Sequence, residues 1–528
     1  MKKILTLLIS IILISTCFIG CADKTTPLSN VEGAVKSGNG SFAVEKGDYL
    51  YFISGKQAIN ADNKFGEVQK GSLQRVKTSD LSNLAGANIE TVIPKLFVSS
   101  SYATGFYIYG DCVYFATPSD EKNHKGEIKT SELEFFRFNL KTGKTDNKEI
   151  ATAKTGSTEF RFIENNGKVY LAFTSSETVD SATVNKLVVY DTETKKEVFT
   201  SDGYSQLLMP EDNSKYFYYT QKGVLKDLDN KSASFDELYR YEIGEESADI
   251  FLSGAGSNYL ESAGRKDLDA SQLIKESGFS GVTINLIKNT GKIVVYKVTS
   301  VDDNSIISYY GFNTFDSIED LKKTENNPLV KFNGSNSLLS TKLVASSYYK
   351  ALNEIYYVDS QDVTKGLCKF NHERANDGDL KNGVEFITKD ASELSIAFAD
   401  TVVVNDAQKT ILYLSSSAEG IYYQCDLSTG AVEKINSIAF NTSTEWYSPR
   451  VINGKYFIGS LTSETYLNYV YVKDMTNIGK DEYETNLEKI VEENRENALS
   501  IMATGLLDET AKESVQAKID ENFPEDEE

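Results

Sequence analysis

The side chains that could carry hydrolytic catalysis are few and lie far apart. The chain contains only two histidines, His124 in a polar loop and His372 after a predicted strand. A Ser-His-Asp hydrolase also needs an exposed nucleophilic serine, and no Gly-x-Ser-x-Gly segment supplies one. The sequence therefore argues against this class of hydrolase.

Metal chemistry has equally little support. Residues 301–304 and 376–379 are rich in Asp and Asn, which are oxygen ligands. Neither segment has the twelve-residue loop with a terminal glutamate that binds calcium, and turn formation explains both. No Gly-x-x-x-x-Gly-Lys loop cradles a phosphate. We predict no resident metal and no cofactor.

The five cysteines do not have the spacing of a disulfide framework. Two lie near the N-terminus, at 17 and 21, and the other three are widely spaced, at 112, 368 and 425. An odd remainder without a Cys-x-x-Cys pair predicts neither disulfides nor a metal site. We expect Cys112, Cys368 and Cys425 to be small buried residues in strands.

One aromatic segment could bind a ligand. Trp446, the only tryptophan, is followed by Tyr447 and Arg450. Adjacent aromatic rings near a guanidinium can stack on a sugar or anchor a protein partner. Packing between structural units is the alternative role. Carboxylates could also support a glycosidase or lyase, although 77 acidic residues leave no particular pair to choose.

Composition and charge set broad limits. The 528 residues are 40% hydrophobic, with 31 Tyr and 27 Phe but only 7 Pro. This composition favours a globular body built of β-sheet. The formal charge of −22 repels phosphate backbones, so we exclude nucleic acid as a partner.

The N-terminus has the organisation of an export signal. Two lysines precede an apolar run over residues 4–19, which is too short to span a bilayer. The run ends in Phe18-Ile19-Gly20-Cys21, which resembles the lipobox of bacterial lipoproteins. The resemblance implies a leader over residues 1–20, a lipid on Cys21 and attachment to the outer face of the bacterial cell membrane. We expect residues 21–41 to be a flexible tether.

A repeated unit dominates residues 42–477. In a representative copy, a turn and strand at 110–115 are followed by a polar loop and a second strand ending in Asn139-Leu140-Lys141-Thr142-Gly143. The turn-plus-strand half occurs eight times, at 47–52, 110–115, 166–171, 213–218, 291–296, 353–358, 408–413 and 453–458. Such a period indicates repeated supersecondary units.

Small sheets of this kind bury both faces by stacking around an axis. The sequence therefore predicts an all-β fold, a β-propeller with eight blades, or seven if the fifth unit is an insertion. We expect the Tyr and Phe residues to fill the core between blades. The Asn-Gly-Lys-aromatic turns and the Asp/Asn-x-x-Thr-Gly strand ends resemble bacterial propellers grouped with the low-density-lipoprotein-receptor-related propeller. That resemblance implies a fold and carries no catalytic residues.

The pattern changes to a helical period after Asp481. Thr485 and Glu488 have the spacing of a capping box, and apolar residues then fall on one helical face. We predict an acidic amphipathic α-helical extension over residues 481–528. It could pack on the flank of the propeller or dock a partner.

These features together predict a lipid-anchored, non-enzymatic surface protein that recognises a protein or a polysaccharide through one propeller face. The alternative is a carbohydrate-active enzyme with carboxylates at the central channel. The two hypotheses differ because an enzyme should gather carboxyl groups with shifted pKa values in one pocket, whereas a binding module should expose a contact surface.

Overall fold

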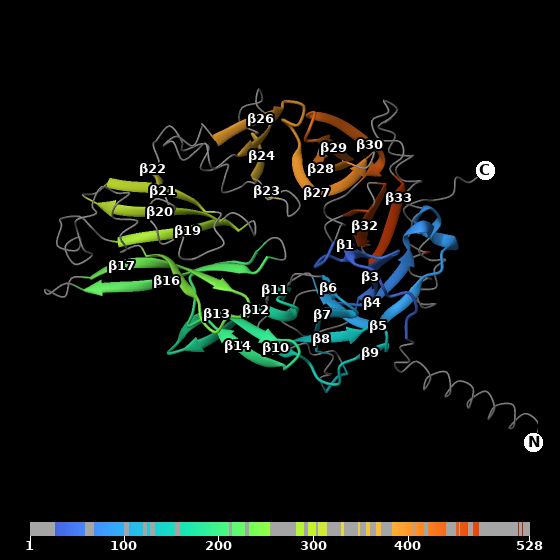
Figure 1. Ribbon diagram of the computed structural model, residues 1–528, viewed down its shortest axis with the longest axis horizontal. Coiled ribbons are helices and arrows are strands. Elements are labelled where there is room, and N and C mark those ends of the chain that lie inside the picture. Colours follow the sequence, from blue (N-terminus) through green and yellow to red (C-terminus); the bar gives the residue numbers. More distant parts are fainter. Residues whose placement is uncertain are drawn as a thin grey trace, which may run out of the picture.

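The computed structural model is a ring of β-sheets arranged around a common centre (Figure 1). It describes residues 27–58, 68–99, 105–119, 124–126, 132–153, 159–210, 214–226, 232–253, 281–289, 294–302, 305–313 and 329–331. It also describes residues 347–348, 355–359, 366–370, 383–404, 407–416, 421–439, 450–452, 455–462, 468–474, 516 and 520.

The first half of the ring contains three antiparallel sheets. The first sheet has the order β1-β2-β3-β4-β5, the second β10-β8-β7-β6 with β9 beside β8, and the third β11-β12-β13-β14. Their strands are β1 Val35–Ser37, β2 Ala43–Lys46, β3 Tyr49–Ala58, β4 Val68–Lys77, β5 Glu90–Ser99, β6 Phe106–Tyr109, β7 Cys112–Pro118, β8 Leu133–Asn139, β9 Lys144–Thr145, β10 Ala151–Ala153, β11 Phe160–Asn165, β12 Lys168–Val179, β13 Ala182–Asp191 and β14 Lys196–Thr200. A 3₁₀ helix, η1 (Thr78–Gly86), follows β4.

The second half begins with one large sheet. Its order is β15-β16-β17-β19-β20-β21-β22, with β18 beside β17. Its strands are β15 Gln206–Leu208, β16 Tyr216–Lys226, β17 Ser232–Glu242, β18 Asp249–Ser253, β19 Gly281–Asn289, β20 Val294–Asp302, β21 Ser305–Asn313 and β22 Leu329–Lys331.

Two four-stranded sheets and one three-stranded sheet complete the ring. Their strands are β23 Ser347–Tyr348, β24 Ile355–Asp359, β25 Gly366–Phe370, β26 Val384–Thr388, β27 Ser395–Val404, β28 Ala407–Ser416, β29 Ile421–Asp426, β30 Ala431–Ala439, β31 Arg450–Ile452, β32 Tyr456–Thr462 and β33 Asn468–Asp474.

Each repeated unit begins with a hairpin whose turn chemistry is visible in the sequence. Asn166 and Gly167 connect β11 to β12 with φ values of 52° and 76°. Both residues are in the left-handed region, which two-residue hairpin turns require and which Asn-Gly adopts at low cost. Within the described residues, the strand part of each predicted segment lies at the start of β3, β7, β12, β16, β20, β24, β28 or β32, whereas residues 408–410, predicted as a turn, already belong to β28. The sequence therefore located the repeat correctly.

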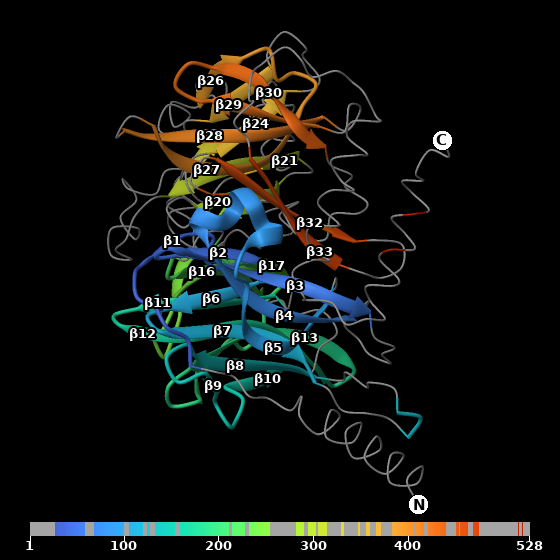
Figure 2. The ribbon, with the colours of Figure 1, turned by 90° about the vertical axis from the view of Figure 1, so that its right-hand side faces the viewer.

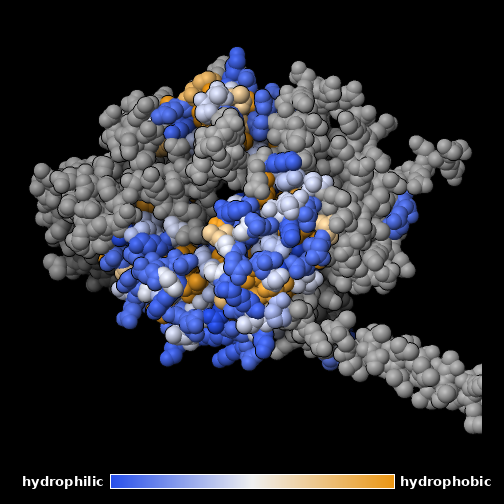
Figure 3. All heavy atoms as spheres, turned by 45° about the vertical axis from the view of Figure 1, so that its right-hand side comes forward, coloured by the Kyte–Doolittle hydropathy of each residue, from blue (hydrophilic) through white to orange (hydrophobic). Residues whose placement is uncertain are grey.

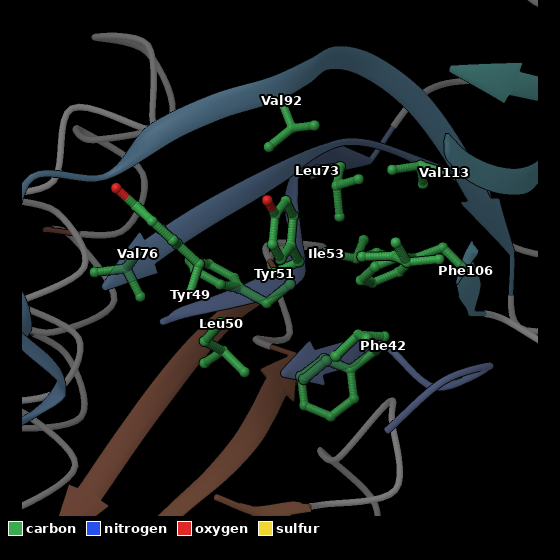
Figure 4. Packing of buried hydrophobic residues seen from close by; sticks show 14 of the residues in the cluster. Phe42, Tyr49, Leu50, Tyr51, Ile53, Leu73, Val76, Val92, Phe106 and Val113 are labelled. Carbon is green, nitrogen blue, oxygen red and sulfur yellow. The ribbon is translucent and has the colours of Figure 1, made fainter. Parts of the chain in front are cut away.

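The ring is closed by apolar packing between its ends. Phe42, just before β2, and Leu50 and Tyr51 of β3 belong to one buried cluster with Ile452 and Ile458 of the last sheet. Figure 4 shows this cluster, with Phe106 and Val113 of the second sheet on its other side. Full burial of a large apolar side chain contributes about 1.5–3 kcal/mol, so this core accounts for the joining of the ends.

The structure corrects the predicted number of blades. Six sheets contain four strands or more, so the propeller has six blades, not eight or seven. Two predicted units merge because β17 and β19 pair in parallel, at Ser234 with Gly281 and at Phe235 with Val282. The last unit is a three-stranded sheet, which packs against the first blade. The all-β propeller fold itself is confirmed.

Residues 27–41 differ from the flexible tether that we expected. Val31 is buried in the core, and β1 pairs with β2. The polar composition of this segment suggested disorder, but its backbone carbonyls are held by buried cations, as described below.

The structure describes little of the C-terminal extension. Within residues 481–528 it describes only Gln516 and Asp520, both helical and joined by a hydrogen bond of 2.7 Å from Nε2 to Oδ1. The remainder of the predicted helices lies outside the described residues. No helix in the described part of the chain is long and apolar enough to cross a membrane.

Candidate recognition face

The two faces of the ring are built from different connections. The first and second strands of a unit meet in short turns, such as Gly47-Asp48, Gly110-Asp111 and Asn166-Gly167, and we call this side the tight-turn face. The second and third strands meet at the opposite side, which we call the hairpin face. In Figure 2, β6 points left toward its tight turn, and β3 runs from the tight-turn face on the left to the hairpin face on the right.

Ion pairs repeat along the tight-turn face. Lys168 lies 3.8 Å from Asp191, and Lys215 lies 2.7 Å from Glu242. In each pair the lysine follows the turn, and the carboxylate ends the third strand of the same unit. The Asn-Gly-Lys part of the repeated motif therefore has a structural role, since it pairs the lysine with the neighbouring strand end.

The same face has other partnered charges. Lys141 pairs with Asp111 at 2.7 Å, and Arg137 bridges Asp146 at 3.2 Å and Glu193 at 2.5 Å. The hydrogen bond and charge of Asp111 raise the pKa of Lys141. Figure 3, which includes this face, shows a described surface made mainly of hydrophilic side chains. These charged side chains pair with one another. We therefore interpret the tight-turn face as a scaffold surface.

The most exposed described element is on the hairpin face. The hairpin of β12 and β13 extends beyond its sheet, because β11 pairs only with residues 168–173 of β12 and β14 only with residues 188–191 of β13. We call residues 174–186 the arm. Residues 176–183 are all exposed, and a turn at Asp180 and Ser181, with φ values of 48° and 68°, forms the tip.

The chemistry of the arm suits hydrogen-bonded recognition. It contains Ser, Thr and Asn side chains, together with a cross-strand ion pair of 2.5 Å between Lys186 and Glu177. Val179 is 46% exposed beside the tip. Asn185 forms an isolated bridge with Tyr204 that holds the base. Strand edges on such a hairpin present backbone donors and acceptors that an extended peptide can pair with.

A polar group lies at the base of the arm, beside inner strand β11. The Thr174 amide donates to the Glu159 carbonyl at 2.9 Å. The Arg161 guanidinium contacts the Glu159 carboxylate at 3.0 Å and donates to the carbonyls of Phe160 and Pro210. Burial raises the pKa of the neighbouring Tyr107 hydroxyl. Glu159 is the half-exposed carboxylate at this site, and it is already paired with a cation.

The predicted site residues are not brought together by the described structure. Arg450 begins β31 and is half-buried, whereas Trp446 and Tyr447 lie outside the described residues, as does Cys21. His124 is exposed in its loop, and His372 is outside the described residues. Cys368 and Cys425 are buried in strands as expected, and Cys112 is half-buried.

Sequence reasoning missed the arm. Its signal was a run of Thr, Ser, Glu and Asp at residues 174–181 between two apolar strands. Such a run predicts a loop as readily as a projecting hairpin, because both are polar and exposed.

Comparisons with known proteins give a fold-level resemblance and no family. No protein family and no curated protein match the sequence. Among solved structures, an acylaminoacyl peptidase from Pyrococcus horikoshii is 11% identical with a TM-score of 0.34, and TolB from Acinetobacter baumannii is 11% identical with a TM-score of 0.21. The Dos1 propeller is 11% identical with a TM-score of 0.25.

The shared lengths also differ among these structures. The matches cover 81% of this chain in each case, and 50%, 81% and 95% respectively of the other chains. The chain thus spans only half the length of the peptidase. Likenesses with such low TM-scores carry no argument about function, so the fold rests on the sheet topology described above.

Proposed function

We propose that this chain is a lipid-anchored surface protein of bacteria that recognises a partner through its hairpin face, without catalysis. The proposal includes export through the N-terminal leader, a lipid on Cys21 and membership of the propellers similar to the low-density-lipoprotein-receptor-related group. The observation that supports recognition is the exposed arm, because the tight-turn face opposite to it is covered with paired charges.

A protein partner fits the arm better than a glycan. Between Ser176 and Val184 the outer strand edges of the arm have no strand partner among the described residues and lie beside small hydroxyl side chains, and an extended peptide can add a strand to such an edge. Trp446 and Tyr447 would add aromatic contact if they lie at the same surface. A polysaccharide partner is the second outcome of the experiment below.

The test is cross-linking on intact cells followed by mass spectrometry of the joined chains. In the test variant, residues 178–183 are replaced by Asn-Gly, which shortens the arm. Glu177 and Val184, which are opposite each other in the same kind of pair as Val179 and Ala182 at the present turn, then close a two-residue hairpin with its register preserved. We expect the cross-linked protein to disappear while the melting temperature stays close to that of the parent chain.

A matched control changes the opposite face of the same sheet. Thr194→Ala with Lys196→Ala alters two exposed residues, one in the turn after β13 and one at the start of β14. We expect it to retain the partner. Loss of the partner in this control, with retention in the arm variant, would refute recognition through the hairpin face. Recovery of a polysaccharide alone would replace the protein by a glycan as ligand.

The alternative is a glycosidase or lyase, for which Glu159 is the first described candidate. It lies beside inner strand β11 with its carboxylate half-exposed. If Glu159→Gln abolished the release of sugar fragments from cell-wall polysaccharide, catalysis would replace recognition as the proposed function.

A further inference from the structure

The chain entering the ring is held as a rigid strap, which we define as residues 28–34. The Ser29 and Asn30 carbonyls accept hydrogen bonds from the Arg75 guanidinium at 2.6 and 3.3 Å. The Val31 and Gly33 carbonyls accept from Nζ of Lys46, the latter at 2.7 Å. Four carbonyls of the strap are thus bound by two side chains of the first blade.

The two cations that hold the strap are almost fully buried. Arg75 is 0% exposed, pairs with Glu90 at 2.8 Å and stacks on the Tyr49 ring at 4.2 Å. Lys46 is 4% exposed, and burial lowers its pKa. Since a buried cation without partners is costly, release of the strap would leave both side chains in an unfavourable state.

The strap crosses the tight-turn face. Its Leu28 amide donates to the Leu140 carbonyl, next to the first turn of the second blade, at 3.1 Å. Its other end lies on the first turn of the first blade, where the Gly47 amide donates to the Ala34 carbonyl at 3.1 Å. In Figure 2 the dark-blue start of the described chain lies on the left, the side of the tight turns.

Little chain separates the strap from the proposed lipid. Six residues lead from Cys21 to Pro27, the first described residue, and even fully extended they span only about 20 Å. The ten residues of β3 alone extend about 33 Å from the tight-turn face to the hairpin face. The anchor therefore cannot reach around the ring to the hairpin face.

We propose that the tight-turn face lies against the lipid headgroups and that the recognition face points away from the membrane. The inference rests on the proposed lipidation of Cys21. The headgroup-facing surface would then contain Lys141, Lys168 and Lys215, each beside a carboxylate. Paired charges limit the repulsion that a chain of net charge −22 would otherwise meet at an anionic surface.

The test measures the distance from each face to the bilayer. Full-length lipidated protein is reconstituted into phosphatidylcholine vesicles that contain a headgroup-linked fluorescent acceptor. A donor dye is attached at Thr194→Cys on the tight-turn face or at Ala182→Cys beside the arm tip, two exposed positions of one sheet. We expect severalfold higher energy transfer from position 194. Equal transfer, or higher transfer from position 182, would overturn the proposed orientation.

Controls separate this inference from the lipid proposal. Cys21→Ser should abolish flotation with vesicles, and flotation without Cys21 would refute lipid anchoring whatever the orientation. The unsubstituted chain corrects for dye on Cys112, which is half-buried. Lys46→Met, which removes the cation bound to Val31 and Gly33 at similar side-chain length, should reduce the difference between the two positions in vesicles that still bind the protein. An unchanged difference would show that Lys46 does not set the orientation.

Discussion

Two junctions between units use opposite kinds of contact. The second and third sheets meet in an aromatic seam formed by Tyr107, Tyr114, Phe135, Phe160, Phe162 and Phe173. Its ring centroids lie 5.1–6.4 Å apart in tilted and edge contacts, as between Phe135 and Phe160 at 5.4 Å. The unit that contains β17 and the unit that contains β19 meet instead in a polar seam, which is formed by Gln206, Asp236 and Asn289.

In the polar seam, hydrogen bonds between side chains and backbone groups take the place of apolar packing. The Leu286 amide donates to Oε1 of Gln206 at 2.9 Å, and Nε2 of Gln206 donates to the Ile284 carbonyl at 3.2 Å. The Ile284 amide donates to Asp236 at 2.9 Å. The difference explains the fold, because aromatic packing keeps two sheets as separate layers, whereas hydrogen bonding at β17 and β19 joins two units into one sheet.

The largest predicted effect comes from the aromatic seam. Phe162 is fully buried and contacts four aromatic rings. We expect Phe162→Ala to lower the free energy of unfolding by about 3–5 kcal/mol, because it removes apolar area and leaves a cavity. Denaturant unfolding measures the change. Phe386→Ala, at a 55% exposed site, should change it by less than about 0.5 kcal/mol. Equal losses in the two variants would show that the seam is not a packed core.

A smaller and more local effect is expected at the polar seam. Gln206→Leu removes one hydrogen-bond acceptor and one donor. Because the two hydrogen bonds are partly exposed, we expect the free energy of unfolding to fall by about 1 kcal/mol. Hydrogen exchange should accelerate at Leu286 in β19 and stay unchanged in β11. Gln206→Glu, which keeps an acceptor for the Leu286 amide, should slow that exchange again. Faster exchange throughout the ring would mean that the two seams unfold together.

The smallest effect depends on pH. Burial raises the pKa of Asp236 above its ordinary value of 3.8. The folded chain therefore binds this proton more tightly than the unfolded chain, and the contribution of Asp236 to stability falls as pH rises through the raised pKa. Asp236→Asn keeps an oxygen for the Ile284 amide but cannot ionise. We expect a higher melting temperature at pH 7 and no difference below about pH 4. A lower melting temperature at pH 7 would mean that the charge is stabilising.

The repeat could be predicted from the sequence because it depends on local chemistry. Turn residues such as Asn166 and Gly167 fix the hairpin, and aromatic alternation such as Phe160 and Phe162 fixes the buried side of the strand. The number of blades could not be predicted. It depends on whether Ser234 and Phe235 meet Gly281 and Val282, and on the last unit forming only three strands that pack on the first blade. Neither long-range contact leaves a periodic signal in the sequence.

The strap and the arm were missed for related reasons. Residues 28–34 contain only two larger apolar side chains, Leu28 and Val31, and only the positions of Arg75 and Lys46 in the folded sheet show that the strap carbonyls are bound. The arm resembles a loop in composition, and its extended shape depends on cross-strand pairs such as Glu177 with Val184. Trp446 and Tyr447 remain predicted ligand contacts.

The joining of the first and last sheets has a consequence for biogenesis. Phe42 near the start of the described chain packs in one cluster with Ile452 and Ile458 near its end. Contacts of such long sequence separation form late, because they require closure of a very large loop. A chain exported as we propose could not close its ring until its last strands had crossed the membrane, so the unfolded form that a secretion channel accepts would persist during transport.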